Sequence, residues 1–134
     1  MGLDIGDRTI GVAVSDELNW MAHGICTIKG KSIDYDIEQL DRIIKEKKIS
    51  KIIIGLPKNM NNTIGDSGKK SIEFGEKLKN RYPDIEIVFW DERLTTVAAE
   101  KVLIEADVSR KNRKKVIDKV AATFILQGYI DAQK

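Results

Sequence analysis

Hydrophobic and polar positions follow one period over the first thirty residues and a different one afterwards. Three short apolar segments come first: GLDI (2–5), TIGVAVSD (9–16) and MAHGICTIKG (21–30). In the second segment Ile10, Val12 and Val14 alternate with smaller residues, which is the period of a strand. The GDRT segment that links the first two has the composition of a tight hairpin turn. We therefore predict three consecutive strands in an antiparallel meander.

From residue 33 onward the apolar residues recur at helical spacing, which predicts a helix that Ser32 can cap and that ends near Lys48. KIIIGLP (51–57) is a continuous apolar run ended by Gly and Pro, as in a strand covered on both faces. The strand IEIVFWDE (85–92) is expected to be covered on both faces as well. The other segments are predicted as a loop at 58–68 and helices at 69–81, 95–106 and 113–132.

The predicted order is three strands, then helix, strand, helix, strand, and finally two helices. Helices that alternate with strands imply parallel crossovers. No internal repeat or linker divides the 134 residues. The sequence therefore predicts a single domain over residues 1–134, of the α/β class, with a mixed five-stranded sheet and helices on both of its faces.

Composition narrows the class of protein without naming its activity. A hydrophobic content of 42% and a charged content of 33% are typical of a globular protein. No apolar run approaches the ~20 residues of a membrane span, and the first residues do not form a signal peptide. Cys26 is the single cysteine, which excludes an internal disulfide. We expect a cytoplasmic protein that does not bind membranes.

A basic segment stands out although the net charge of +2 is too small to imply nucleic-acid binding. The segment is RKNRKK, with basic residues Arg110, Lys111, Arg113, Lys114 and Lys115. It is either a solvated loop or helix start, or a patch that binds phosphates.

Carboxylates occur at two strand positions where an apolar residue is the rule. Asp4 lies between Leu3 and Ile5, and charged side chains are rarely buried unless something pairs with them. Asp4 is either a strand-end residue in an Asx-type turn or a ligand for a positive group. Asp91 and Glu92 end the most apolar strand, at the kind of strand terminus where α/β sheets bind ligands. Alternatively, these two residues simply mark the end of the strand.

The last predicted helix carries a third such carboxylate. At about 100° per residue, Lys119, Thr123 and Gln127 share a polar stripe. Asp118 lies on the opposite side, level with four apolar positions: Ala121, Ala122, Ile125 and Tyr129. Local rules are most often broken at functional sites. Alternatively, Asp118 lies early enough in the helix to favour its dipole and meet water.

The three carboxylate sites could converge in a mixed sheet, because the first strand and the 85–92 strand would lie side by side or nearly so. Carboxylates gathered in a half-buried cleft repel each other unless a cation intervenes. Mg²⁺ and Mn²⁺ prefer such oxygen ligands, and two ions about 4 Å apart are typical of enzymes that act on phosphates. His23 is the single histidine. It is expected to be a strand or loop residue rather than a general base.

Four ordered motifs together resemble the YqgF family of bacterial Holliday-junction resolvase-type proteins, which belong to the ribonuclease H-like nucleases. The motifs are GLDIGDRTIGVAVSD, IIIGLPKNMNNTIGDSG, FWDERLTT and KKVIDKVAATFILQGYID, and they span almost the whole chain. The resemblance implies a ribonuclease H-like fold with a five-stranded mixed sheet flanked by helices. It also implies a cytoplasmic, divalent-metal-dependent nuclease, a hydrolase that helps process the 5′ end of pre-16S ribosomal RNA.

The acidic positions of that family fall here on Asp4, Glu92 and Asp118. The resemblance thus implies that Asp4 bridges two Mg²⁺ or Mn²⁺ ions, with Glu92 on one and Asp118 on the other. Asp91 stays open as a metal ligand, with Glu92 then pairing with a basic residue. Side chains expected to hold the nucleic-acid backbone, besides the basic segment 110–115, are Arg8, Lys58, Asn59, Arg93, Thr95 and Thr96.

The chain departs from this family in two places. Relatives commonly carry residues before GLD where here only Met1 stands, so the first strand is expected to be short. The loop has NMNN where relatives often have Asp-Gly, which changes the turn and its substrate contacts but not the metal site.

Three other functions remain open from the sequence. A resolvase of four-way DNA junctions would keep the chemistry and would require a homodimer for paired cuts. A non-catalytic nucleic-acid-binding module acting on ribosomal precursor particles would keep only the fold. An actin-like ATPase shares the first motif, but such proteins need two domains and several hundred residues.

Overall fold

Eight strands and helices make up the described part of the chain. The computed structural model describes residues 1–6, 8–16, 21–57, 64–91 and 110–132, and over 110–119 it describes the backbone alone. The elements are β1 (Gly2–Ile5), β2 (Thr9–Ser15), β3 (Ala22–Lys29), α1 (Ile33–Glu46), β4 (Lys51–Leu56), α2 (Asp66–Arg81), β5 (Glu86–Asp91) and α4 (Arg110–Ala132).

The strands form one mixed sheet in the order β3-β2-β1-β4-β5. β1 pairs antiparallel with β2, which pairs antiparallel with β3, so the predicted meander is confirmed. β1 and β4 are parallel, and so are β4 and β5. The first strand and β5 are therefore separated by β4 alone, as the sequence suggested.

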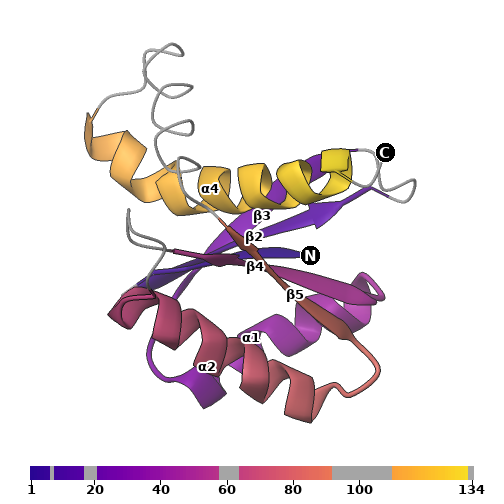
Figure 1. The fold of residues 1–134 in the computed structure, drawn as a ribbon. Helices are drawn as coiled ribbons and strands as arrows, with labels where there is room; N and C mark the ends of the chain where they lie inside the picture. Colours follow the sequence, from indigo (N-terminus) through magenta and orange to yellow (C-terminus); the bar gives the residue numbers. More distant parts are fainter. Residues whose placement is uncertain (7, 17–20, 58–63, 92–109, 133–134) are drawn as a thin grey trace.

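Helices cover the two faces of the sheet unequally, with α1 and α2 on one face and α4 on the other (Figure 1). The α1/α2 face buries large side chains, among them Leu3, Ile54 and Phe74. The α4 face buries a smaller cluster, in which three alanines accompany Ile53, Ile125, Leu126 and Ile130. No helix among the described residues is long and apolar enough to cross a membrane.

The start of α1 is as predicted, because the Ser32 hydroxyl accepts a hydrogen bond from Tyr35 N at 3.2 Å. The start of α2 is not: the helix begins at Asp66 rather than residue 69. Asp66 in the first turn suits the positive end of the helix dipole. Gly68, which discouraged a helical prediction, is buried where an added Cβ would lie 2.8 Å from the Pro57 carbonyl oxygen.

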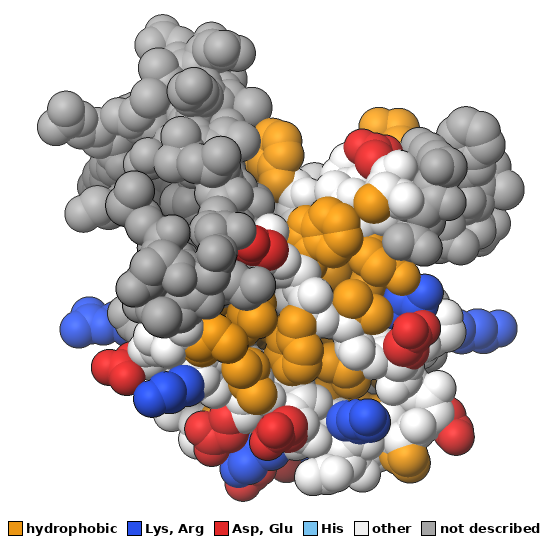
Figure 2. All heavy atoms as spheres, in the orientation of Figure 1, with side chains coloured by type: hydrophobic (Ala, Val, Ile, Leu, Met, Phe, Trp, Pro, Cys, Tyr) orange, Lys and Arg blue, Asp and Glu red, His pale blue; other side chains and the backbone are white. Residues whose placement is uncertain are grey.

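Two further predictions need correction. β5 is an edge strand with half-buried side chains and Phe89 is 37% exposed, so neither face of this strand is fully covered. Hydrophobic side chains gather at this edge between α2 and α4 (Figure 2).

In addition, α4 begins at Arg110 instead of residue 113, since Arg and Lys are good helix formers. The basic segment 110–115 thus forms the first turns of the helix. The helix predicted at 95–106 lies outside the described residues.

A polar cluster ties α1 to the end of α2. The Tyr82 hydroxyl donates a hydrogen bond to Asp41, which also lies 3.0 Å from Lys45 Nζ and 3.9 Å from the Arg81 guanidinium. The hydrogen bond from Tyr82 and the charge of Lys45 hold the pKa of Asp41 below its usual value. Burial and the bond to Asp41 raise the pKa of Tyr82 to about 12. The cluster stabilises the fold at a distance from the candidate site.

Candidate functional site

Asp4 lies in the central strand and on the α4 face of the sheet. Its neighbours Leu3 and Ile5 belong to the apolar core under α1 and α2. Gly2 faces the other way, because a Cβ there would lie 2.7 Å from Leu126 Cβ in α4. Strand alternation places Asp4 with Gly2. The Asp4 side chain is half-buried, so it is neither a core residue nor a freely solvated turn residue.

A glycine pairs with Asp4 in β2, and another glycine follows the last residue of β4 that pairs with β1. Gly11 in β2 is the direct partner of Asp4. In β4, Gly55 follows Ile54, which pairs with Leu3. Gly55 in turn pairs with Trp90 of β5. Gly11 and Gly55 themselves place no side chain beside the Asp4 carboxylate.

The turn after β1 is fixed by three hydrogen bonds from different elements. Gly6 N donates to Thr9 O at 2.8 Å and closes the turn. Gly30 N, just after β3, donates to Arg8 O at 2.7 Å. The third comes from α2, where Lys70 Nζ donates to Gly6 O at 2.9 Å. The end of the strand that carries Asp4 is therefore held from β2, β3 and α2.

The backbone of α4 leads from the middle of the sheet toward the end where Asp4 lies. Gly2, at the start of β1, packs on Ala122 and Leu126. The helix and β1 run in opposite directions, so residues of α4 before Ala122 lie nearer the end of β1 (Figure 1). Position 118 is one turn before Ala122 on the same side of the helix. Its place in the helix fits convergence with Asp4, although the Asp118 side chain is outside the described part.

Asp91 lies on the opposite face of the sheet from Asp4. Phe89, two residues earlier, packs on Gly75 of α2, whereas Trp90 packs on Gly128 of α4. Alternation along β5 therefore places Asp91 with Phe89 on the α2 face and Trp90 on the Asp4 face. The sequence left Asp91 open as a ligand because both faces of the strand were expected to be covered alike.

Only some of the other predicted site residues belong to the described part of the chain. Arg8 is exposed in the turn after β1. The basic residues Arg110, Lys111, Arg113, Lys114 and Lys115 are on the first turns of α4, described by backbone alone. Outside the described residues lie Lys58, Asn59, Glu92, Arg93, Thr95 and Thr96. Among the side chains that are described, no three of His, Cys, Asp or Glu form a group that could hold a metal.

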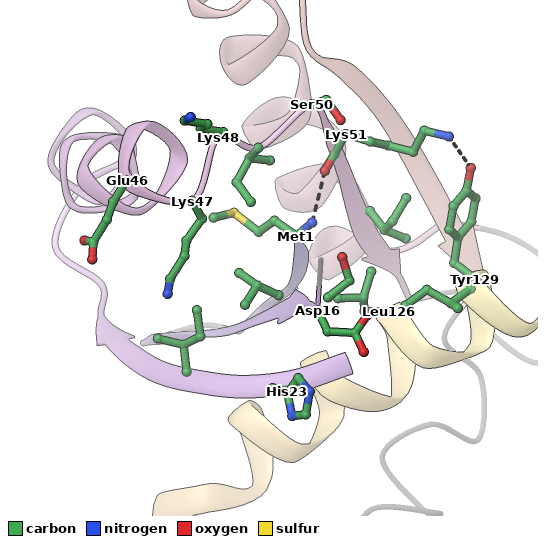
Figure 3. A pocket seen from close by; sticks show the side chains of 16 residues that line it. Met1, Asp16, His23, Glu46, Lys47, Lys48, Ser50, Lys51, Leu126 and Tyr129 are labelled. Atoms are coloured by element: carbon green, nitrogen blue, oxygen red, sulfur yellow. Dashed lines mark hydrogen bonds between the residues drawn. The ribbon is translucent and has the colours of Figure 1, made fainter. Parts of the chain in front are cut away.

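A hollow of about 1260 Å³ lies at the other end of the sheet (Figure 3). Met1, His23 and Tyr129 line it, together with lysines from the end of α1 and the start of β4. The Met1 amino group donates to Lys51 O at 3.0 Å, and burial lowers its pKa to about 6. His23 is exposed on β3, so it is a strand residue, as predicted. Asp4 and Asp91, the predicted ligands whose side chains are described, do not line this hollow.

Several residues of the candidate site were missed from the sequence. Gly11 and Gly55 interrupt apolar runs, and an isolated glycine in a strand is a signal of close approach by a ligand or backbone. Lys70 had no such signal, because it resembles the other lysines on the surface of α2. Only the three-dimensional arrangement shows that it contacts the turn after Asp4.

The part of the candidate site that is described is chemically suited to a divalent cation. Asp4 supplies the hard oxygen ligand that Mg²⁺ and Mn²⁺ prefer, and its partner in β2 is a glycine. The donor set would be completed by carboxylates from outside the described side chains.

Comparisons with known proteins agree on the family. A profile described as "RuvX: Holliday junction resolvase" matches residues 1–132. A Staphylococcus haemolyticus protein named "Putative pre-16S rRNA nuclease" is 58% identical over 134 residues, which cover 98% of this chain and 94% of the relative. A Staphylococcus aureus protein of the same name is 54% identical over the same shares of both chains.

Solved structures agree on the fold. The structure described as "T. thermophilus RuvC in complex with Holliday junction substrate" superposes with a TM-score of 0.61 at 13% identity, covering 98% of this chain and 92% of that one. Fowlpox virus resolvase bound to Holliday junction DNA gives a TM-score of 0.59 at 12% identity, with 98% and 96% covered. The mixed five-stranded sheet is thus ribonuclease H-like, as the motifs implied. The chain belongs to the RuvX, or YqgF, family of Holliday junction resolvases.

Proposed function

We propose that the chain is a divalent-metal-dependent nuclease that hydrolyses phosphodiester bonds in the 5′ processing of pre-16S ribosomal RNA. The observation that carries the proposal is Asp4, a half-buried carboxylate between two glycine-bearing strands in a member of a nuclease family. The names of the relatives support the ribosomal substrate. We assign the activity to the cytoplasm, on precursor ribosomal RNA or the particles that contain it.

Asp4, Glu92 and Asp118 are the proposed metal ligands. Bound at these carboxylates, two Mg²⁺ or Mn²⁺ ions would supply an activated water and neutralise charge at the leaving oxygen. Asp4 holds its carboxylate toward α4, and position 118 belongs to that helix. Asp91 faces α2, which supports the next residue, Glu92, as the ligand from this strand.

The start of α4 is the proposed backbone-binding surface on this side. Five basic residues in its first turns add to the positive end of the helix dipole. Arg8, in the turn that follows Asp4, is exposed and available for a phosphate. The remaining proposed contacts are Lys58, Asn59, Arg93, Thr95 and Thr96.

A nuclease assay with matched carboxylate variants tests the proposal. Asp4→Asn is expected to lower Mn²⁺- or Mg²⁺-dependent cleavage at least about 100-fold, since even residues that only support metal ligands cost 10–100-fold. Asp91→Asn removes the same charge on the other face and is expected to stay within about twofold of wild type. Urea unfolding should show Asp4→Asn as stable as wild type or slightly more so without metal, because it removes like-charge repulsion. Equal cleavage by all three proteins would overturn the assignment.

Junction resolution is the second candidate, favoured by the family description. Precursor RNA and four-way DNA junctions should be compared in the same assay, with the solution mass measured in parallel. Faster cleavage of precursor RNA by a monomer supports RNA processing. Paired junction cuts by a homodimer support resolution, and binding without cleavage of either substrate supports a non-catalytic module.

A further inference from the structure

A second group of cations surrounds the turn after Asp4, and we call it the basic rim: Arg8, Lys29, Lys31 and Lys70. Lys29 pairs with Thr9 at the end of β3. The hydrogen bond from Gly30 N to Arg8 O joins the backbones on which Arg8, Lys29 and Lys31 stand. Lys70 reaches the same turn from α2 through Gly6 O. Four cations from three parts of the chain thus meet at one end of the sheet.

The outer members of the rim face solvent. Arg8, Lys29 and Lys31 are exposed, and within the described part of the chain none of them forms an ion pair. Lys31 Nζ lies over the Tyr35 ring, 4.8 Å from its centroid, so its charge stays available to a further partner.

Two acidic residues lie in the first turn of α1, near the rim, and each has a partner of its own. Asp36 is buried and accepts a hydrogen bond from Lys31 N at 3.1 Å. Asp34 lies 3.9 Å from Lys77 Nζ. Asp7, in the same turn, is outside the described residues.

A hollow of about 140 Å³ lies behind the rim, lined by residues that include Gly30, Lys70 and Asp36. The buried Asp36 carboxylate would repel an anion inside this hollow. The surface of the rim, where Arg8, Lys29 and Lys31 are exposed, has no such obstacle. Any phosphate bound here would therefore contact the rim from outside, as part of a longer chain rather than as a free ion in a pocket.

The rim is close to the proposed cleavage site. Gly6 is two residues from Asp4, about 7 Å along an extended chain, which is of the order of two nucleotide steps along one strand. Ile28 packs on the α1/α2 core, so alternation along β3 places Lys29 on the α4 face, whereas Lys70 comes from α2. The rim therefore spans both faces at this end of the sheet, and the first turns of α4 lie on one of those faces (Figure 1).

We propose that the basic rim binds the phosphodiester backbone of the substrate at the end of the sheet just beyond Asp4, so that the rim and the first turns of α4 hold successive phosphates of one nucleic acid. This inference rests on the proposed nuclease function and adds Lys29 and Lys31 to its substrate contacts. The recognised chemistry is the backbone of a structured RNA or of a branched DNA.

The test compares two double variants that remove the same charge. Lys29→Gln/Lys31→Gln alters the rim, and Lys47→Gln/Lys48→Gln alters exposed lysines after α1, at the other end of the sheet. Both are made in the Asp4→Asn background, and fluorescence anisotropy gives Kd for a hairpin RNA and a four-way DNA junction at several salt concentrations. The rim pair should lower the slope of log K against log salt by about two, and the control pair should leave it unchanged.

Cleavage kinetics with Asp4 intact supply the second readout. The rim pair is expected to raise KM without changing kcat, and Lys29→Arg/Lys31→Arg, which keeps both charges, should restore the wild-type KM and salt slope. This charge-conserving variant also separates a binding defect from a folding defect. An effect on RNA alone, or on DNA alone, supports the rim and identifies the substrate.

Two results would overturn the inference, and they differ in what they mean for the nuclease. If the wild type cleaves but the rim and control pairs give the same salt slope and KM, the rim is not a binding surface and the proposed function stands. If the wild type neither binds nor cleaves either substrate, the nuclease proposal fails together with the rim.

Discussion

The two faces of the sheet are built from different side chains and serve different purposes. Under α1 and α2, large aliphatic and aromatic residues such as Leu40 and Phe74 are almost fully buried. Under α4 the buried cluster is smaller and mixes three alanines with Ile53, Ile125, Leu126 and Ile130, and the face includes Gly2 and Asp4. We infer that the α1/α2 face contributes the larger share of buried apolar surface, while the α4 face combines close helix packing on Gly2 with a carboxylate in the same strand.

The largest effect is expected from a cavity in the α1/α2 face. Phe74 is 1% exposed, and Phe74→Ala should lower the free energy of unfolding by about 3–5 kcal/mol. Urea denaturation measures the loss, and cleavage per folded molecule should remain near the wild-type value. A mutant that folds normally but cleaves poorly would contradict the division between the two faces.

Two glycine-to-alanine substitutions, one under each face of the sheet, are expected to have intermediate effects on stability and cleavage. In Gly2→Ala the new Cβ would lie 2.7 Å from Leu126 Cβ and 2.9 Å from Ala122 O, so α4 must move. Overpacking of this kind costs about 1–3 kcal/mol. Because α4 carries position 118, we expect cleavage to fall by more than the folded fraction does.

The matched control for this substitution is Gly75→Ala. Its Cβ would meet Phe89 Cζ at 2.6 Å, but Phe89 is partly exposed and its ring can shift. Alanine also favours the helix by about 1 kcal/mol over glycine. Stability within about 1 kcal/mol of wild type and unchanged cleavage are expected. If Gly75→Ala reduced cleavage as much as Gly2→Ala, the two faces would not differ in function.

The smallest effect concerns the polar cluster at the far side of α1 and α2. The pKa of Tyr82 is raised to about 12 in the folded protein, against an ordinary value of 10.0. The neutral phenol is therefore favoured by folding, and its contribution to stability is complete below pH 10 and is lost as the pH rises from 10 toward 12. Tyr82→Phe should flatten this part of the stability curve, measured by urea unfolding at pH 8, 10 and 11. An identical alkaline slope in both proteins would show that Tyr82 does not couple to folding.

The sequence predicted those features that depend on local pattern. The meander, the cap at Ser32 and the anomaly at Asp4 were all visible, because strand alternation and helix capping are local effects. The start of α2 was misjudged because Gly68 argued against a helix, while its reason, the close approach of Pro57, is a tertiary contact.

Questions that depended on which face a residue occupies could not be answered from the sequence. Asp91 and Glu92 are adjacent carboxylates, and only the packing of Phe89 on α2 and Trp90 on α4 shows that Asp91 faces away from Asp4. The hydrogen bond from Lys70 to the Gly6 carbonyl joins residues 64 positions apart and has no sequence signature. Glu92 and Asp118 stay predictions, because their side chains lie outside the described part.

The unequal pairing of β1 has a consequence for how the site can adapt. Only Gly2 and Leu3 of β1 pair with β4, through Ile53 and Ile54, whereas pairing with β2 continues through Asp4 to Ile5. Pairing between β1 and β4 thus ends before Asp4, whereas pairing between β1 and β2 continues past it. Ile5 and Leu56, just beyond the point of separation, are still buried, so the core holds both strands there. Changes in the segments that follow Ile5 and Leu56 can therefore alter substrate contacts while the pairs that fix the register of the central strand stay intact.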